Sequence, residues 1–122
     1  MKAVIIGCGH LGQALLHYPN FADMGLTIVG GFDVDSSLNG KKIDGKPIYH
    51  IDDLKTKLAE LGGEIAIVTV PAAHAQEAVD KAVEAGAKGI WNFAPTHVTV
   101  PNGIVIENFN FSSSLAVLMH NL

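Results

Sequence analysis

The sequence predicts an α/β fold of the Rossmann type, with a doubly wound, mainly parallel sheet of about six strands. Three observations support this prediction. Short apolar runs alternate with segments of helical periodicity, which is the pattern of successive β-α-β units. A glycine-rich turn at residues 7–12 follows the first apolar run and opens the first helical segment. Asp33 ends the second apolar run, about 20 residues after Gly12.

Each predicted strand is a short run rich in aliphatic residues and bounded by glycine, proline or polar residues. The expected strands are residues 3–6, 26–33, 47–49, 64–70, 89–93 and 103–107. Residues 34–45 are polar and contain glycines, which indicates a loop. Because parallel strands end at one edge, we expect a ligand site at the carboxyl ends of the first, second, fourth and fifth strands.

Segments with helical spacing follow the first, third and fourth strands, and another ends the chain. The second of these helices can be capped by Asp52 or Asp53 and end at Gly62-Gly63, and the third ends at Gly86. Serines at residues 112–114 can cap the last helix. In chain order, the expected apolar faces are Leu11, Ala14, Leu15 and Tyr18; Leu54, Leu58 and Leu61; Ala75, Ala78, Val79, Ala82 and Val83; and Leu115, Leu118, Met119 and Leu122.

The C-terminal helix needs a packing partner. With only about ten residues, it is too short to be stable alone in water. Its apolar side could pack on the chain's own sheet or on a partner subunit. In the second case a symmetric homodimer is the commonest arrangement.

Length and composition predict a single domain spanning residues 1–122, because a chain of this length supports one core. The net charge of -4 argues against direct contact with nucleic acid, which requires a basic surface. No apolar run reaches the roughly 18 residues of a membrane span, and no signal peptide is visible. With one cysteine, the chain cannot form an internal disulfide and is expected to be cytoplasmic.

The glycine-rich turn and Asp33 together predict a dinucleotide site. Gly7 permits a tight turn, Gly9 lets backbone N–H groups approach a pyrophosphate, and Gly12 lets the helix lie close to the strand. The helix N-terminus adds N–H donors and the positive end of its dipole. Asp33 can accept hydrogen bonds from the adenosine ribose and would repel a 2′-phosphate, so we expect NAD(H). The alternative is that Asp33 only caps a loop.

Two turns at the expected ligand edge add further candidates. Val70-Pro71 ends the fourth strand, and Asn92 stands near the end of the fifth, ahead of Ala94-Pro95. The amide of Asn92 could pair with a carboxamide such as that of nicotinamide. A purely structural turn is an equal alternative at both places. His10, inside the glycine-rich turn, could reach a phosphate or the nicotinamide ribose.

The remaining reactive side chains form no recognisable catalytic or metal site. Cys8 stands at a helix N-terminus, which would favour a thiolate, although a simple packing role is commoner there. The six histidines are scattered and lack convergent ligand partners, so no metal is expected. No residue set resembles an acid–base or nucleophilic centre. The chain is therefore not expected to be an enzyme, and its cofactor would act as a signal.

Several motifs together resemble the Rex family of redox-sensing transcriptional repressors. The most specific are the extended glycine turn, Gly-Cys-Gly-His-Leu-Gly-Gln-Ala-Leu-Leu-His-Tyr, and the later turn Asn-Phe-Ala-Pro. The similar segments run in order along nearly the whole chain. They are residues 7–18, 31–35, 40–43, 47–50, 69–72, 92–95 and 106–110.

This resemblance implies a module that senses the NADH/NAD⁺ ratio. Members of the family are homodimers that bind NAD(H) in a carboxyl-terminal domain, exchange the final helix between subunits and release DNA when NADH binds. By analogy Asp33 would hold the adenosine ribose, residues 70–71 and 92–95 would line the nicotinamide side, and Tyr18 would lie near the nicotinamide of the partner subunit. The full set of expected cofactor contacts is Gly7, Gly9, His10, Leu11, Gly12, Tyr18, Asp33, Val34, Val70, Pro71, Asn92, Phe93, Ala94 and Pro95.

Two departures from the family pattern bear on DNA binding and switching. The family has an amino-terminal winged-helix domain, whereas this sequence begins at the first Rossmann strand, so we expect no operator binding by this chain alone. The family usually has Asp where this chain has Asn110, and that Asp alternates between the Tyr18 position and the DNA-binding domain. Asn110 can still form hydrogen bonds but carries no charge, which affects the switching step more than NAD(H) binding.

Other functions stay open at this stage. The chain could be the cofactor-binding part of an oxidoreductase or epimerase completed by another chain, which turnover of NADH would reveal. It could be a CoA-binding domain of the acyl-CoA ligase type, although Asp33 disfavours the 3′-phosphate of CoA. It could also be a structural dimerisation module that binds no nucleotide.

Overall fold

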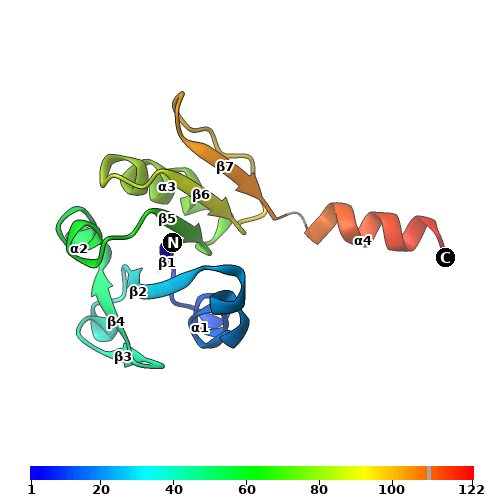
Figure 1. Cartoon of the computed structure of the whole chain (residues 1–122). Coiled ribbons are helices and arrows are strands. Elements are labelled where there is room, and N and C mark those ends of the chain that lie inside the picture. Colours follow the sequence, from blue (N-terminus) through cyan, green and yellow to red (C-terminus); the bar gives the residue numbers. More distant parts are fainter. Residues whose placement is uncertain (110) are drawn as a thin grey trace.

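The computed structural model of the chain describes residues 1–109 and 111–122. Within them, a seven-stranded sheet has the order β3-β4-β2-β1-β5-β6-β7 (Figure 1). The strands are β1 (Lys2–Ile6), β2 (Thr27–Asp33), β3 (Lys42–Ile43), β4 (Lys46–His50), β5 (Ile65–Val68), β6 (Gly89–Asn92) and β7 (Val105–Asn108). Neighbouring strands pair in parallel except β3 and β4, which are antiparallel. The expected Rossmann-type, mainly parallel sheet is confirmed.

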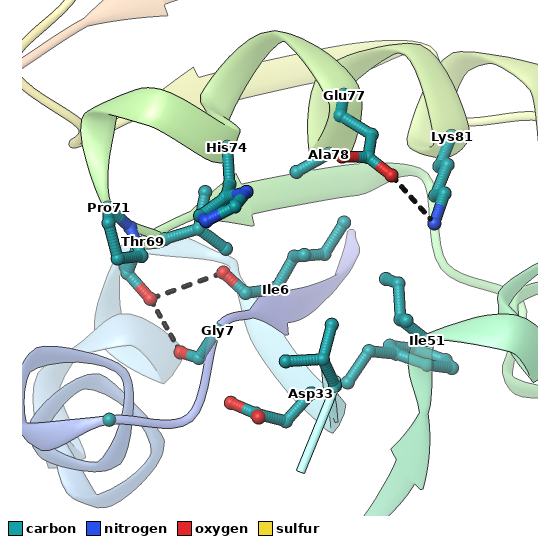
Figure 2. Close-up of a pocket in the computed structure, with 14 residues that line it drawn as sticks. Ile6, Gly7, Asp33, Ile51, Thr69, Pro71, His74, Glu77, Ala78 and Lys81 are labelled. Carbon is teal, nitrogen blue, oxygen red and sulfur yellow. Dashed lines mark hydrogen bonds and ion pairs between the residues drawn. The ribbon is translucent and has the colours of Figure 1, made fainter.

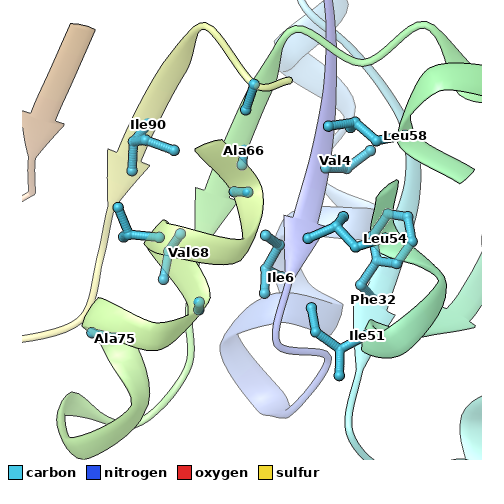
Figure 3. Packing of buried hydrophobic residues seen from close by; sticks show 14 of the residues in the cluster. Val4, Ile6, Phe32, Ile51, Leu54, Leu58, Ala66, Val68, Ala75 and Ile90 are labelled. Carbon is cyan, nitrogen blue, oxygen red and sulfur yellow. The ribbon is translucent and has the colours of Figure 1, made fainter. Parts of the chain in front are cut away.

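Three of the four α-helices in the described residues cover the two faces of this sheet. These three are α1 (His10–His17), α2 (Leu54–Leu61) and α3 (Ala75–Glu84); the fourth is α4 (Phe111–His120), and short 3₁₀ turns are η1 (Pro19–Met24), η2 (Ser36–Leu38), η3 (Ile51–Asp53) and η4 (Ala72–His74). Alternate residues of β1 serve the two cores: Val4 and Ile6 pack under α2 and α3 (Figure 3), while Ala3 and Ile5 pack on the α1 side. Burial on both faces explains why the strand has no polar alternation.

The stripe expected on α3 is confirmed, since Ala75, Ala78, Val79 and Ala82 are buried. The expected loop at residues 34–45 was wrong in part, because it contains η2 and the short strand β3. β3 forms a hairpin with β4 through Asp44 and Gly45, whose φ angles are 51° and 75°. An Asp-Gly pair is the usual signal for such a tight turn, and it stands in the sequence.

The apolar face predicted for α1 was wrong in part, because only Leu15 of that face packs against the core. The helix buries Gly12 and Leu16, whereas Leu11 and Tyr18 remain 38% and 44% exposed. The cause is Gly12: a Cβ there would overlap the carbonyl oxygen of Gly7, so this side of the helix lies directly against the glycine turn. Leu16, one turn later, then faces the sheet, and Leu11 and Ala14 point outward.

The C-terminal helix α4 extends away from the body of the molecule (Figure 1). It begins at Phe111, ahead of the serines expected to cap it. Every residue from Ser114 to Leu122 is exposed, including Leu115, Leu118 and Met119. Packing of this helix on its own sheet, one of the two options left open above, is therefore not what the structure shows. Asn110 lies outside the described residues.

None of the helices in the described part of the chain is long and apolar enough to cross a membrane.

Candidate functional site

A pocket of about 510 Å³ lies at the carboxyl edge of the parallel sheet (Figure 2). One side is formed by the ends of β1 and β2 and by η3, and the other by the end of β5, by η4 and by α3. This is the edge expected from the topology of an open α/β sheet. Its lining residues are Ile6, Gly7, Gly9, Phe32, Asp33, Val34, Ile51, Thr69, Val70, Pro71, His74, Glu77, Ala78 and Lys81.

The glycine turn is held in place by hydrogen bonds to β2 on one side and to Thr69, directly after β5, on the other. Gly7 has φ of 99°, a conformation that disfavours other residues, and its backbone N–H donates to the carbonyl of Phe32 at 2.8 Å. The hydroxyl of Thr69 donates to the carbonyl oxygens of Gly7 and Ile6, at 2.6 and 3.2 Å. The turn is therefore fixed before any ligand arrives.

Gly9 differs from Gly7 and Gly12, because nothing in the chain itself requires a glycine there. A Cβ on Gly9 would meet no heavy atom within 4 Å, and its φ of -74° suits any residue. Gly9 is also the N-cap of α1, and no side chain caps that helix. An open space in front of an uncapped helix N-terminus fits a phosphate group, whose oxygens accept hydrogen bonds from backbone N–H groups.

Asp33 stands at the pocket with both carboxylate oxygens oriented. Oδ2 accepts a hydrogen bond from the Cys8 backbone N–H at 2.6 Å, and Oδ1 accepts one from the Asp35 N–H at 2.8 Å. The capping role considered above is therefore present. It does not exclude a ligand role, because each carboxylate oxygen can accept a further hydrogen bond.

Cys8 is a packing residue in this structure, with its side chain only 1% exposed. Its Sγ lies 3.6 Å from the carbonyl oxygen of Phe32. Burial, and to a smaller extent the nearby Asp33 carboxylate, raise the pKa of the Cys8 thiol to about 12. The expectation that the helix N-terminus would favour a thiolate was wrong, because desolvation dominates here.

Asn92 is fully buried and uses its amide inside the turn that it begins. Nδ2 donates to the carbonyl oxygens of Ala94 and Thr96, both at 3.2 Å, and to Asn108 Oδ1 at 3.1 Å. Oδ1 accepts from the Ala94 N–H at 3.0 Å. The structural alternative for Asn92 therefore holds in this structure, since its donors and acceptor are already engaged.

The structure brings only part of the expected contact set to the pocket. Gly7, Gly9, Asp33, Val34, Val70 and Pro71 line it, whereas His10, Leu11, Gly12, Tyr18, Asn92, Phe93, Ala94 and Pro95 do not. Tyr18 instead packs edge-on against Phe21, with ring centroids 4.8 Å apart. Among the described residues, no group of three His, Cys, Asp or Glu side chains could hold a metal ion.

Sequence reasoning missed the wall formed by α3. His74, Glu77 and Lys81 follow one another at helical spacing on the flank of the buried stripe. Projecting that flank onto the expected ligand edge would have found them. Ile51, which begins η3 directly after β4, was also missed, and its place at a strand end was the available signal.

Comparison with known proteins agrees with this geometry. Residues 1–96 match the family model described as the CoA binding domain. The redox-sensing transcriptional repressor Rex of Treponema denticola is 44% identical over 117 residues, which cover 96% of this chain and 56% of that protein. The chain thus spans about half the length of the curated relatives that it matches.

Solved structures give the same result. RSP, a Rex-family repressor, is 34% identical, and its complex with beta-NADH has a TM-score of 0.91, covering 98% of this chain and 58% of that one. Its complex with beta-NAD⁺ and operator DNA has a TM-score of 0.92, covering 98% and 55%. A UDP-D-quinovosamine 4-dehydrogenase from Vibrio fischeri, at 12% identity and a TM-score of 0.65 over 96% of this chain and 84% of that one, shares the fold alone.

The high-identity matches are thus to transcriptional repressors, and the resemblance to Rex expected from the motifs is confirmed. The family model described as the CoA binding domain matches residues 1–96, so the chain belongs to the CoA binding domain family.

Proposed function

We propose that this chain binds NAD(H) and reports the NADH/NAD⁺ ratio as the sensor module of a redox-responsive transcriptional repressor. The observation that carries the proposal is the pairing of an open, uncapped helix N-terminus at Gly9 with the oriented carboxylate of Asp33 in one pocket. The similar repressor RSP is described in complexes with beta-NADH and with beta-NAD⁺. This supports the choice of ligand.

The pocket suggests how its residues would hold the dinucleotide. The pyrophosphate would take the space in front of Gly9, with backbone N–H groups of α1 as donors. Asp33 would accept from the adenosine ribose, and Val34 and Ile51 would pack against the adenine. Bound NAD(H) supplies the redox information in its nicotinamide ring, which would lie toward Val70 and Pro71.

Other expected contacts would act less directly. The Asn92–Pro95 turn would shape the nicotinamide side through its own hydrogen bonds, and Gly12 would keep α1 close to β1. His10, Leu11 and Tyr18 lie on the outward side of α1, so we propose that they contact the nicotinamide half of a dinucleotide bound by a partner subunit.

We further propose that the module does not catalyse a reaction of its own. A hydride transfer needs a substrate held against the nicotinamide and a residue that moves a proton. An enzyme with a completing chain is the competing hypothesis, and consumption of NADH with small carbonyl compounds would support it.

The exposed apolar helix α4 supports a homodimer as part of this proposal. Leu115, Leu118 and Met119 are each more than half exposed, and contact with a second copy would remove them from water. Operator binding would be a property of the longer protein, as the RSP complex with operator DNA suggests. Residues 1–122 would form one NAD(H)-binding unit, working in the cytoplasm.

CoA is the second candidate ligand, because the matching family model is described as a CoA binding domain. Calorimetric titration of the purified chain with NADH, NAD⁺, NADPH and CoA distinguishes the two. We expect NADH to bind more tightly than NAD⁺, and NADPH and CoA to bind weakly. Tight binding of CoA without binding of NADH would overturn the proposal.

A further inference from the structure

The wall of the pocket opposite Asp33 carries a second carboxylate. Figure 2 shows α3 running along the pocket, with His74 near Thr69 and Pro71 and with Lys81 toward the end where Ile51 lies. Glu77 stands between His74 and Lys81 along the helix. Asp33 lies on the facing wall. A ligand that extends from the glycine turn toward Ile51 therefore passes between two acidic side chains.

The cation on this wall is already engaged by Glu77. Lys81 Nζ lies 3.3 Å from Glu77 Oε1, and these side chains are 39% and 65% exposed. Among the described lining residues, Lys81 is the one lysine or arginine. The pair therefore offers little free positive charge to a ligand, and Asp33 adds a negative charge opposite it.

We propose that Glu77, acting with Lys81, is a specificity-determining residue that selects against adenosine ligands with a phosphate on the ribose. This rests on the proposed function, because it assumes that an adenine dinucleotide binds in this pocket. NADP(H) and CoA carry such a phosphate, and NAD(H) does not. The pyrophosphate common to all of them is served by the N-terminus of α1, so the discrimination falls on the additional phosphate alone.

The physical basis is charge repulsion together with the loss of a counter-ion. A phosphate monoester carries about -1.5 to -2 charges at neutral pH and prefers a cation or several donors. Here it would meet two carboxylates, and the charge of the one lysine is offset by its ion pair with Glu77. Without the Glu77 charge, Lys81 becomes free to pair with the phosphate.

A purely structural role for the pair predicts a different result. Exposed ion pairs four residues apart on a helix contribute little to stability. α2 carries a similar pair, in which Lys57 Nζ lies 3.2 Å from Glu60 Oε2, and neither residue lines the pocket. Glu60→Gln is therefore the matched control for Glu77→Gln.

The test is calorimetric titration of the full chain and of both variants with NADH, NADPH and CoA. Glu77→Gln is expected to tighten binding of NADPH and CoA at least about fivefold while changing NADH less than about twofold, because the altered charge acts on the extra phosphate. Higher salt should reduce that gain. Adding Lys81→Met to Glu77→Gln should remove most of it, and Glu60→Gln should leave all three affinities unchanged.

Two failures can be told apart. If the unaltered chain binds NADH but the ratio of NADPH to NADH affinity is the same in Glu77→Gln, the role of Glu77 is overturned and the proposed function stands. If the unaltered chain binds no NADH, the proposed function fails, and this inference fails with it.

Discussion

The backbone N–H of Cys8 donates a hydrogen bond of 2.6 Å to the carboxylate of Asp33. This contact joins the acid at the end of β2 to the glycine turn after β1. The two parts of the dinucleotide motif, separated by 25 positions in the chain, therefore form one connected unit. A substitution that moves the glycine turn would therefore also move Asp33, and a substitution at Asp33 would also affect the turn.

Gly9 and Gly12 should respond differently to the same substitution. Gly12→Ala places a Cβ against the carbonyl oxygen of Gly7, and we expect a loss of more than about 3 kcal/mol in the free energy of unfolding. Gly9→Ala should cost at most about 1 kcal/mol, because its Cβ meets no atom of the chain. Gly9→Ala should nevertheless weaken NADH binding about tenfold or more, since the Cβ enters the space for the pyrophosphate.

Urea unfolding and NADH titration measure these two effects separately. If Gly9→Ala bound NADH as tightly as the unaltered chain, the phosphate position assigned to this turn would be wrong.

Cys8 should make stability depend on alkaline pH. Burial raises the pKa of its thiol from 9.0 to about 12, so the folded chain holds this proton where the unfolded chain releases it. The stability that the neutral thiol contributes is complete below pH 9 and is lost as the pH rises toward 12. Urea unfolding between pH 8 and 11 should show this decline, and Cys8→Ala should lose that part of the pH dependence.

The same burial should protect the thiol from reagents. Modification by a disulfide reagent at pH 8 should be slow in the folded chain and rapid in urea. Rapid modification of the folded chain would contradict the buried position of Cys8.

Asn92 should be important for stability. Asn92→Ala leaves the carbonyl groups of Ala94 and Thr96 and the N–H of Ala94 without their partner, so we expect a loss of about 2–4 kcal/mol in urea unfolding. Asn121→Ala is the control, because Asn121 is exposed and donates through its side chain to Val117. A loss in Asn92→Ala no larger than in this control would show that the turn is not held by Asn92.

The apolar side of α4 should control assembly. Light scattering should give the unaltered chain twice its 12.9 kDa monomer mass, and Leu118→Glu should give a monomer, because a buried unpaired carboxylate would be costly at an interface. Asn121→Glu adds the same charge just after the end of the helix and should leave the mass unchanged. A monomeric unaltered chain would contradict a homodimer through this helix.

The parts of the fold that followed from the sequence depend on local patterns. The parallel strands are apolar runs, and the spacing of the glycines predicts the tight turn between β1 and α1. The outward rotation of α1 could not be found in this way, because it follows from the close approach of Gly12 to Gly7 and not from the spacing of Leu11 and Leu15. Apolar periodicity alone selected a face of which only Leu15 packs against the core.

The site, like the fold, could be predicted from the sequence only in part. Asp33, Gly7 and Gly9 were expected at the ligand edge and line the pocket, because they follow strand ends, where topology determines their position. Glu77 and Lys81 were missed because they are polar and stand on the flank of α3 beside its buried stripe, which apolar periodicity alone does not place at the pocket. For Asn92 the sequence left a ligand contact and a structural turn equally open, and only its four hydrogen bonds show that the amide is occupied.

The central claim is that this pocket binds NAD(H) through Asp33, and titration of NADH into the unaltered chain, Asp33→Asn and Asp35→Asn tests it most directly. Asp35 is an exposed carboxylate two residues away that caps η2, so it controls for local charge. The account predicts that Asp33→Asn weakens NADH about tenfold or more, because a hydrogen bond to a charged acceptor is lost, while Asp35→Asn changes it less than about twofold. Equal NADH affinity in Asp33→Asn and the unaltered chain, or no binding of NADH by the unaltered chain, would contradict it.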